Sequence, residues 1–302
     1  MACAPGAGAG DVAGFAWFVS IRIRYTVHSD LQYLDFHYRK FPICLFSRCK
    51  ACQTKFTLLR VGFVIQIVSL SLFRFPSLPA RLWVLGQMGL ARLSFWRMHD
   101  VGFWKLCGTG TGEGFTPRPN TAVWAILATW PDAECARRHI TTAPVYRRWA
   151  AHASESWTIL LTPTSSRGQW AGVEPFTPTQ ATFPGPVVAI TRATMRARTF
   201  LRFWRRVPDI SAVIGQDPNV IFKIGIGEVP LLHQVTFSIW PDADAMANFA
   251  RGDGPHGRAI AAVRAEGWFR EELYARFAIV DDWGSWGGQS PIATLKPQKD
   301  AA

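Results

Sequence analysis

The chain has 302 residues, of which 49% are hydrophobic, and a formal net charge of +12. This length and composition supply a core for one large domain or two small ones, which excludes a disordered chain. The positive charge would suit nucleic acid, but no helix-turn-helix, zinc-finger or RNA-binding motif accompanies it, so no nucleic-acid partner is expected. The 14 tryptophans and 21 phenylalanines favour a large apolar ligand, although an aromatic-rich core explains them equally well.

The sequence contains no run of about 20 apolar residues that could span a bilayer. Its best uncharged run, 61–73, is bounded by Arg60 and Arg74. The N-terminus also lacks the basic start and uninterrupted apolar stretch of a signal peptide. The sequence therefore predicts a cytoplasmic protein, and peripheral contact with a membrane stays an open alternative.

Residues 1–66 differ in composition from the rest of the chain, because they hold no glutamate and show no sustained hydrophobic period. They are predicted to be an appendage. Because the segment contains no methionine after Met1, Val64 is an alternative translation start. The spacing of Cys44, Cys49 and Cys52 resembles plant-type iron–sulfur ligands. No downstream cysteine has a supporting context, so unpaired thiols are the favoured interpretation.

The segment 67–168 predicts the order strand–helix–strand–strand–helix–strand from its alternating and helical hydrophobic periods. The expected strands cover 67–75, 101–107, 121–129 and 156–161, and the expected helices cover 78–91 and 130–153, the second broken near Pro144.

The segment 186–282 predicts the same order. Its expected strands cover 187–194, 220–224, 233–239 and 274–280, and its expected helices cover 198–214 and a stretch broken near Pro255. A Trp-Pro-Asp motif stands between a strand and a helix in both segments, at 130–132 and 240–242. These recurrences indicate an internal duplication. Residues 169–185 are predicted to be the linker between the units, and residues 283–302 a flexible tail.

A βαββαβ order gives a four-stranded antiparallel sheet with both helices on one face. Two such units would bury their bare faces against each other. The predicted fold class is therefore α+β, with tandem ferredoxin-like βαββαβ repeats that form an internal pseudo-dimeric α+β barrel. The interior of this barrel is the expected ligand site.

Several uninterrupted blocks occur in order along residues 66–282. They are SLSLFRF at 69–75, GQMGLA at 86–91, GEGFTP at 112–117, FKIGIGEVPLLHQ at 222–234, GPH at 254–256 and RAEGWF at 264–269. Together they closely resemble the spheroidene monooxygenases of purple phototrophic bacteria. The resemblance implies an oxygenase that introduces a keto group at C-2 of acyclic carotenoids such as spheroidene. It also implies O2, reduced ferredoxin as electron donor, and a haem cofactor.

Haem iron needs an axial ligand, commonly a neutral imidazole. Among seven histidines the prediction falls on His256 as the ligand of a haem b, because it follows a Gly-Asp-Gly-Pro break and begins a helical pattern. A polar residue at a helix entry, without a ligand role, is the other interpretation of His256. The alternative is His233, which shares a strand face with Val235 and is more simply a core histidine. Arg74 and Arg192, near the ends of equivalent strands, are candidates for the haem propionates, but a surface arginine is the favoured interpretation of each.

No catalytic residue is assigned from the sequence. No Ser-His-Asp order, paired-carboxylate site or zinc motif stands out, so a hydrolase is disfavoured. The main alternative to an enzyme is a non-enzymatic haem- or carotenoid-binding protein of the same fold.

Overall fold

The computed structural model describes residues 65–112, 118–181, 183–196, 219–229, 232–251 and 267–295. All of them belong to one compact unit, Arg60–Ala302. In chain order the elements are β1 (Ile67–Arg74), α1 (Leu78–Trp96), β2 (Trp104–Gly110), β3 (Pro119–Trp130), α2 (Ala133–Thr142), α3 (Pro144–His152), β4 (Glu155–Gly168), β5 (Val187–Met195), β6 (Phe222–Gly227), β7 (His233–Trp240), α5 (Ala243–Arg251), β8 (Phe269–Gly284) and a 3-10 turn (Ala293–Leu295).

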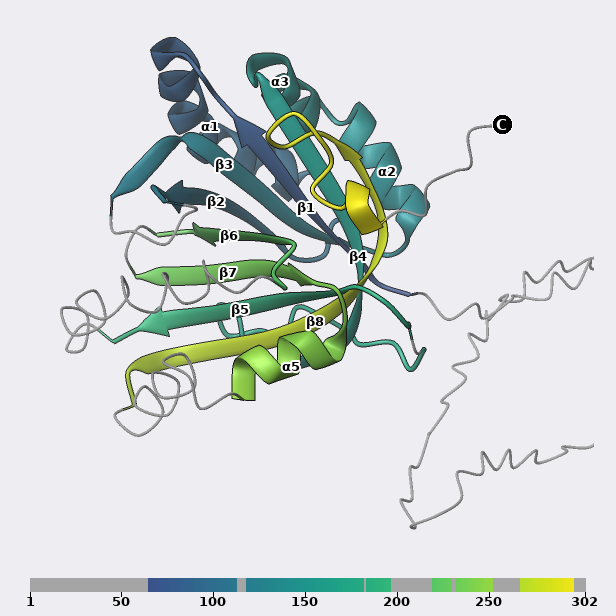
Figure 1. Ribbon diagram of the computed structural model, residues 1–302. Helices are drawn as coiled ribbons and strands as arrows, with labels where there is room; N and C mark the ends of the chain where they lie inside the picture. Colours follow the sequence, from purple (N-terminus) through teal and green to yellow (C-terminus); the bar gives the residue numbers. More distant parts are fainter. Residues whose placement is uncertain are drawn as a thin grey trace, which may run out of the picture. The chain divides into compact units, whose positions relative to one another are not determined.

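The eight strands form one closed antiparallel barrel in the order β1-β3-β2-β6-β7-β5-β8-β4 (Figure 1). The order within the first half, β4-β1-β3-β2, recurs in the second half as β8-β5-β7-β6. The predicted barrel is therefore confirmed, and it is closed by pairing between the edges of the two four-stranded halves. Strands β4 and β8 pair from Trp157↔Gly284 to Gly168↔Leu273, while β2 and β6 share only two residue pairs.

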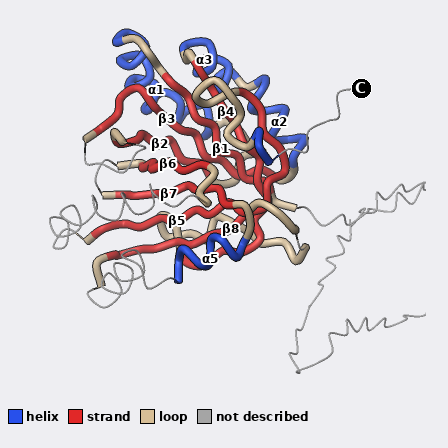
Figure 2. Tube along the Cα trace, in the orientation of Figure 1, coloured by secondary structure: helices blue, strands red, loops and turns tan. Residues whose placement is uncertain are grey.

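The helices lie outside the barrel (Figures 1 and 2). Helix α2 contacts β1 and β3, α3 packs on α1 and α2, and α5 contacts β7. The recurring Trp-Pro-Asp motif has a clear structural reason, since its aspartate caps the helix that follows. The side chains of Asp132 and Asp242 accept hydrogen bonds from the backbone N–H of Cys135 and Ala245, both at 2.7 Å. None of the described helices combines the length and apolar character needed to cross a bilayer.

Two apolar layers follow from the alternation of side chains along the strands. One fills the barrel, and its members include Leu70, Leu127 and Phe237. The other lies between the first-half strands and helices α1 to α3, with Phe95 and Trp149 at its centre. Most of the fully buried aromatic rings belong to one of these two layers, which accounts for much of the tryptophan content.

The predicted strand positions are confirmed, with shifted ends. Strand β4 continues to Gly168 instead of 161, and β8 covers Phe269–Gly284 instead of 274–280, because the pairing of these two strands extends beyond the apolar pattern. Helix α1 is five residues longer than expected. The helix predicted at 198–214 lies outside the described residues.

The predicted linker and the predicted flexible tail both contain residues that pack against the barrel. In the predicted linker, Trp170 and Phe176 are buried in the interior of the barrel. In the predicted tail, Trp283 and Gly284 belong to β8 and Ile292 is buried. Both segments carry apolar side chains that close the barrel ends, a role that their glycine and proline content concealed.

Candidate functional site

The interior of the barrel is apolar in its middle and carries charged groups toward both ends. Successive antiparallel pairings place the C-terminal ends of β1 and β5 at opposite ends of the barrel. Arg74 is the last residue of β1, and Arg192 lies three residues before the end of β5. The two arginines predicted for one cofactor are therefore not brought together, and each end has to be considered separately.

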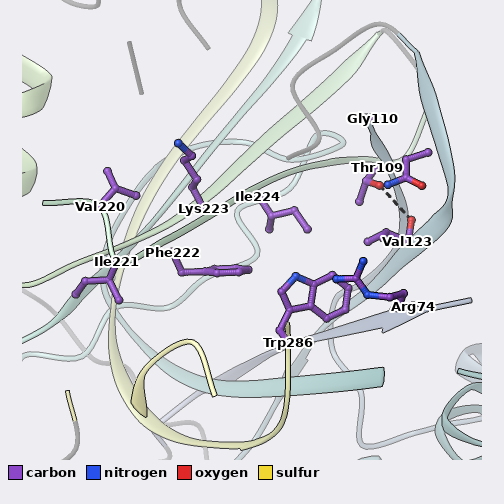
Figure 3. A pocket seen from close by; sticks show the side chains of 11 residues that line it. Arg74, Thr109, Gly110, Val123, Val220, Ile221, Phe222, Lys223, Ile224 and Trp286 are labelled. Carbon is purple, nitrogen blue, oxygen red and sulfur yellow. Dashed lines mark hydrogen bonds between the residues drawn. The ribbon is translucent and has the colours of Figure 1, made fainter. Parts of the chain in front are cut away.

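At the Arg74 end of the barrel lies a cavity of about 560 Å³, here called the mouth cavity (Figure 3). Its lining residues are Arg74, Thr109, Gly110, Asn120, Val123, Val220, Ile221, Phe222, Lys223, Ile224 and Trp286. The lining mixes apolar side chains with the polar or charged Arg74, Thr109, Asn120 and Lys223. It comes from β1, β2, β3, β6, the two residues before β6 and the segment after β8, and the cavity is partly open to solvent. It can therefore contact both apolar and polar parts of a ligand.

The cation at the rim is Arg74. Its guanidinium lies 4.5 Å from the ring centre of Trp286, and its Nε donates to Oε2 of Glu155 at 3.1 Å. Burial alone would raise the carboxyl pKa of Glu155, but the N–H groups of Gly288 and Gly287, together with Arg74, hold that pKa below its ordinary value. The ionised carboxylate thus fixes both the arginine and the turn that carries Trp286.

At the opposite end, five charged or titratable side chains form what we call the polar cluster: Lys105, Arg192, Glu228, His233 and Glu271. Arg192 is only 1% exposed and pairs with both glutamates, while Lys105 Nζ lies 2.7 Å from Glu228. The favoured interpretation of Arg192 as a surface residue was wrong, because two carboxylates compensate its charge inside the barrel. Trp170 Nε1 completes the cluster by donating to Glu228 at 2.9 Å.

His233 lies at the edge of the polar cluster and is about one-quarter exposed. Its Nδ1 is 3.3 Å from Oε2 of Glu228, without the alignment of a hydrogen bond. Partial burial lowers the pKa of His233, and the cations Arg192 and Lys105 lower it further against the opposing effect of Glu228. The imidazole is therefore kept neutral at neutral pH, with Val235 beside it on the inner face of β7.

The two ends share a feature that the sequence interpretation missed. Gly168-Gln169-Trp170-Ala171-Gly172 follows β4, and Gly284-Ser285-Trp286-Gly287-Gly288 follows β8. Each tryptophan turns back to pair with the residue three positions later, Val173 or Gln289. We call these segments the tryptophan turns. The spacing Gly-x-Trp-x-Gly, present once after each unit, was the signal that could have found them.

Each tryptophan turn is held by a glutamate at an equivalent strand position. Glu155 accepts from the N–H of Gly288 at 2.8 Å, and Glu271 accepts from the N–H of Gly172 at 2.7 Å. The register makes the two glutamates equivalent, since Glu155 pairs with Arg74 and Glu271 with Thr194 at the ends of β1 and β5. Arg192 is thus two residues displaced from the position equivalent to Arg74.

The described residues provide only part of a haem site. The lining of the mouth cavity offers Arg74, Lys223 and apolar walls, but its described residues include no His, Cys, Tyr or Met that could ligate iron. His139 is bound to Asp100 at 2.8 Å, and His152 stacks on Trp83. The predicted ligand His256 lies outside the described residues.

No protein-family model matches the chain, but curated relatives do. It is 52% identical over 240 residues to the spheroidene monooxygenase of Rhodobacter capsulatus, covering 78% of this chain and 99% of that protein. The chain belongs to the spheroidene monooxygenase family. The family member from Cereibacter sphaeroides is 55% identical over 239 residues, with 78% of this chain and 74% of that protein covered. The member from Rubrivivax gelatinosus is 31% identical, covering 70% of this chain and 81% of that protein.

Similarity to solved structures is much weaker. An aldoxime dehydratase aligns with 72% of this chain and 82% of its own at a TM-score of 0.49 and 12% identity. A haem-degrading enzyme from Listeria monocytogenes aligns with 68% of this chain and 98% of its own at a TM-score of 0.25 and 10% identity. Such values are too low to support an argument about the site in this member of the spheroidene monooxygenase family.

Proposed function

We propose that the protein is a carotenoid monooxygenase that introduces a keto group at C-2 of spheroidene and related acyclic carotenoids. The observation that carries the proposal is the 52% identity to a spheroidene monooxygenase over 99% of that protein's length. The reaction consumes O2 and electrons, and we propose reduced ferredoxin as the donor. The resemblance of the sequence blocks described above supports both the position of the keto group and the donor.

The mouth cavity supports this substrate class. Its volume of about 560 Å³ falls within the usual range of small-molecule sites, about 300–1,000 Å³. Val123, Phe222, Ile224 and Trp286 give it apolar walls. A carotenoid is much longer than such a cavity, so we propose that only one end of the chain enters. This agrees with oxidation at C-2, close to a terminus.

We further propose a haem b as cofactor, with His256 as axial ligand and His233 as the alternative. When bound, the haem would supply the activation of O2. Of the two predicted propionate contacts we favour Arg74, whose side chain is 41% exposed at the cavity rim. This contact goes with His256 as ligand, because His233 lies at the opposite end of the barrel. Arg192 is occupied by two carboxylates inside the polar cluster, which supports a structural role for it.

We also propose that the barrel is a tandem pseudo-dimer, with units 67–168 and 186–282 joined by 169–185. Three observations support it. The strand order repeats, the Trp-Pro-Asp cap repeats, and each unit is followed by a tryptophan turn held by an equivalent glutamate.

The test is turnover by the purified full chain with spheroidene, reduced ferredoxin and isotopically labelled O2. We expect a product that has gained a carbonyl oxygen carrying the label, identified by mass spectrometry. Omission of ferredoxin is the control and should stop product formation. A protein that binds carotenoid or haem tightly but forms no oxidised product under any donor would instead be the non-enzymatic binding protein considered above.

A further inference from the structure

Helix α1 presents an apolar face to solvent. Its residues at 78, 82, 85, 93 and 96 recur at helical spacings, with Gly89 filling the remaining turn of the same face. The five large side chains are Leu78, Leu82, Leu85, Leu93 and Trp96, and their exposure ranges from 45% for Leu85 to 82% for Trp96. We call this set the α1 stripe. Figure 1 shows α1 on the outside of the barrel.

The stripe is not the core-facing side of the helix. Val84, Ala91 and Phe95 form a separate buried face, and the ring of Phe95 stacks on Trp104 at a centroid distance of 4.9 Å. Helix α1 is therefore apolar on two faces, only one of which the barrel uses. Contiguous exposed apolar surface of this kind usually marks a contact with a partner or a membrane.

The charges around the stripe identify the class of partner. Arg81 and Arg92 lie on the helix and Arg97 caps its C-terminus, while residues 78–97 contain no aspartate or glutamate. An apolar stripe flanked by cations, with a tryptophan at its end, matches the chemistry of an anionic lipid surface. A symmetric contact with a second copy would instead bring the same arginines together without any acidic residue on the helix to balance them.

We propose that α1 lies on the surface of a bilayer containing anionic lipids, with the α1 stripe at the boundary between headgroups and acyl chains. This docking rests on the proposed function, because the proposed substrate, a carotenoid, dissolves in the hydrocarbon of a membrane. Helix α1 begins four residues after Arg74, which lines the mouth cavity. Docking through α1 therefore holds that end of the barrel beside the lipid that contains the substrate.

The experiment is flotation of the full chain with vesicles of phosphatidylglycerol and phosphatidylcholine. We expect wild-type protein to bind, and Leu82→Glu to bind at least about ten-fold more weakly, because a leucine that would enter the lipid is replaced by a charge that anionic lipid repels. The matched control is Val280→Glu, which adds the same charge at another exposed apolar position, on β8, and should bind like wild type. Equal binding by the two variants, or no binding by wild type, would overturn the proposal.

A second measurement does not require the charged variant to fold. Brominated lipids should quench part of the wild-type tryptophan fluorescence, and Trp96→Phe should lose that quenched part. Identical quenching in both proteins contradicts docking through α1. A wild-type dimer that Leu82→Glu dissociates, combined with an absence of vesicle binding, would assign the stripe to a second copy.

Turnover separates this proposal from the proposed function. Leu82→Glu should oxidise spheroidene in detergent micelles like wild type but lose activity toward spheroidene held in vesicles. Retained activity in vesicles counts against docking. If wild type forms no product in either format, the proposed function fails, and flotation still decides whether α1 binds lipid.

Discussion

One glutamate holds the tryptophan turn at each end of the barrel, and Glu155 at the mouth cavity gives the first prediction. Its pKa is depressed below 4.5, so its contribution to stability is fully present above that pH and is lost as the pH falls through the lower folded-state pKa. We expect Glu155→Gln to cost about 1–3 kcal/mol of unfolding free energy at pH 7, since charge-assisted hydrogen bonds are removed.

Urea unfolding at a series of pH values measures this effect. The gap between wild type and Glu155→Gln should shrink on acidification, because protonated Glu155 resembles glutamine. Glu174→Gln, at an exposed position, serves as the control and should leave stability unchanged. A gap that stays constant from pH 7 to well below the ordinary glutamate pKa would contradict the assignment of Glu155 as an ionised anchor.

Arg192 gives a second prediction at the same scale. Replacing it by methionine keeps much of its volume but leaves Glu228 and Glu271 without their shared cation, and uncompensated buried charge typically costs about 3–5 kcal/mol. Thermal unfolding should therefore show a large loss of stability. Adding Glu271→Gln to Arg192→Met should recover part of it. If the double variant is less stable than the single one, the charge balance drawn for the polar cluster is incorrect.

Among the elements, the tryptophan turns make the sharpest demand on backbone geometry. Gly284 has φ 87° and Gly287 has φ 72°, a region that costs other residues about 1–2 kcal/mol. A Cβ on Gly284 would also collide with the carbonyl oxygen of Ser156, whereas one on Gly287 would meet open space. We expect Gly287→Ala to cost about 1 kcal/mol and Gly284→Ala about 2–4 kcal/mol, since overpacking is added.

Chemical unfolding of both variants tests this difference, and each serves as a control for the other because both carry the same conformational cost. Gly284→Ala should in addition weaken carotenoid binding, since it displaces the turn that presents Trp286 to the mouth cavity. Equal losses of stability in the two variants would show that the close approach to Ser156 relaxes without cost.

Sequence patterns predicted the positions of the strands and helices better than the side-chain contacts at the two ends of the barrel. Alternation along a strand such as Val187–Met195 and the capping aspartates are local signals, so the positions of strands and the starts of helices follow from a few neighbouring residues. The polar cluster depends on β2, β5, β7, β8 and the loop after β6, which are distant in sequence and meet only when the barrel closes. The hydrophobic periodicity of one strand could not predict that Arg192 would face two carboxylates instead of solvent.

The candidate site residues were also predicted only in part, because their contacts join segments that are distant in sequence. Arg74 was selected as a possible anion contact and does line the mouth cavity, but Trp286 was placed in a loose tail and Phe222 was assigned no role. Trp170 was likewise taken for linker. A glycine-rich segment is ambiguous in sequence, because glycine serves both flexible connections and tight turns that need positive φ. The positive φ of Gly168 and Gly284 and their close approach to the neighbouring strands distinguish the two uses.

At the scale of the whole molecule, each tryptophan turn follows one half of the barrel and packs against residues of the other half. The turn after β4 closes the end built by Arg192, Glu228 and Glu271, and the turn after β8 closes the end built by Arg74 and Glu155. Neither half therefore carries the tryptophan turn that closes its own end of the barrel. A chain divided between β4 and β5 would leave each fragment with an unsealed interior, so the barrel is expected to form and to unfold in one concerted transition, with neither half persisting alone.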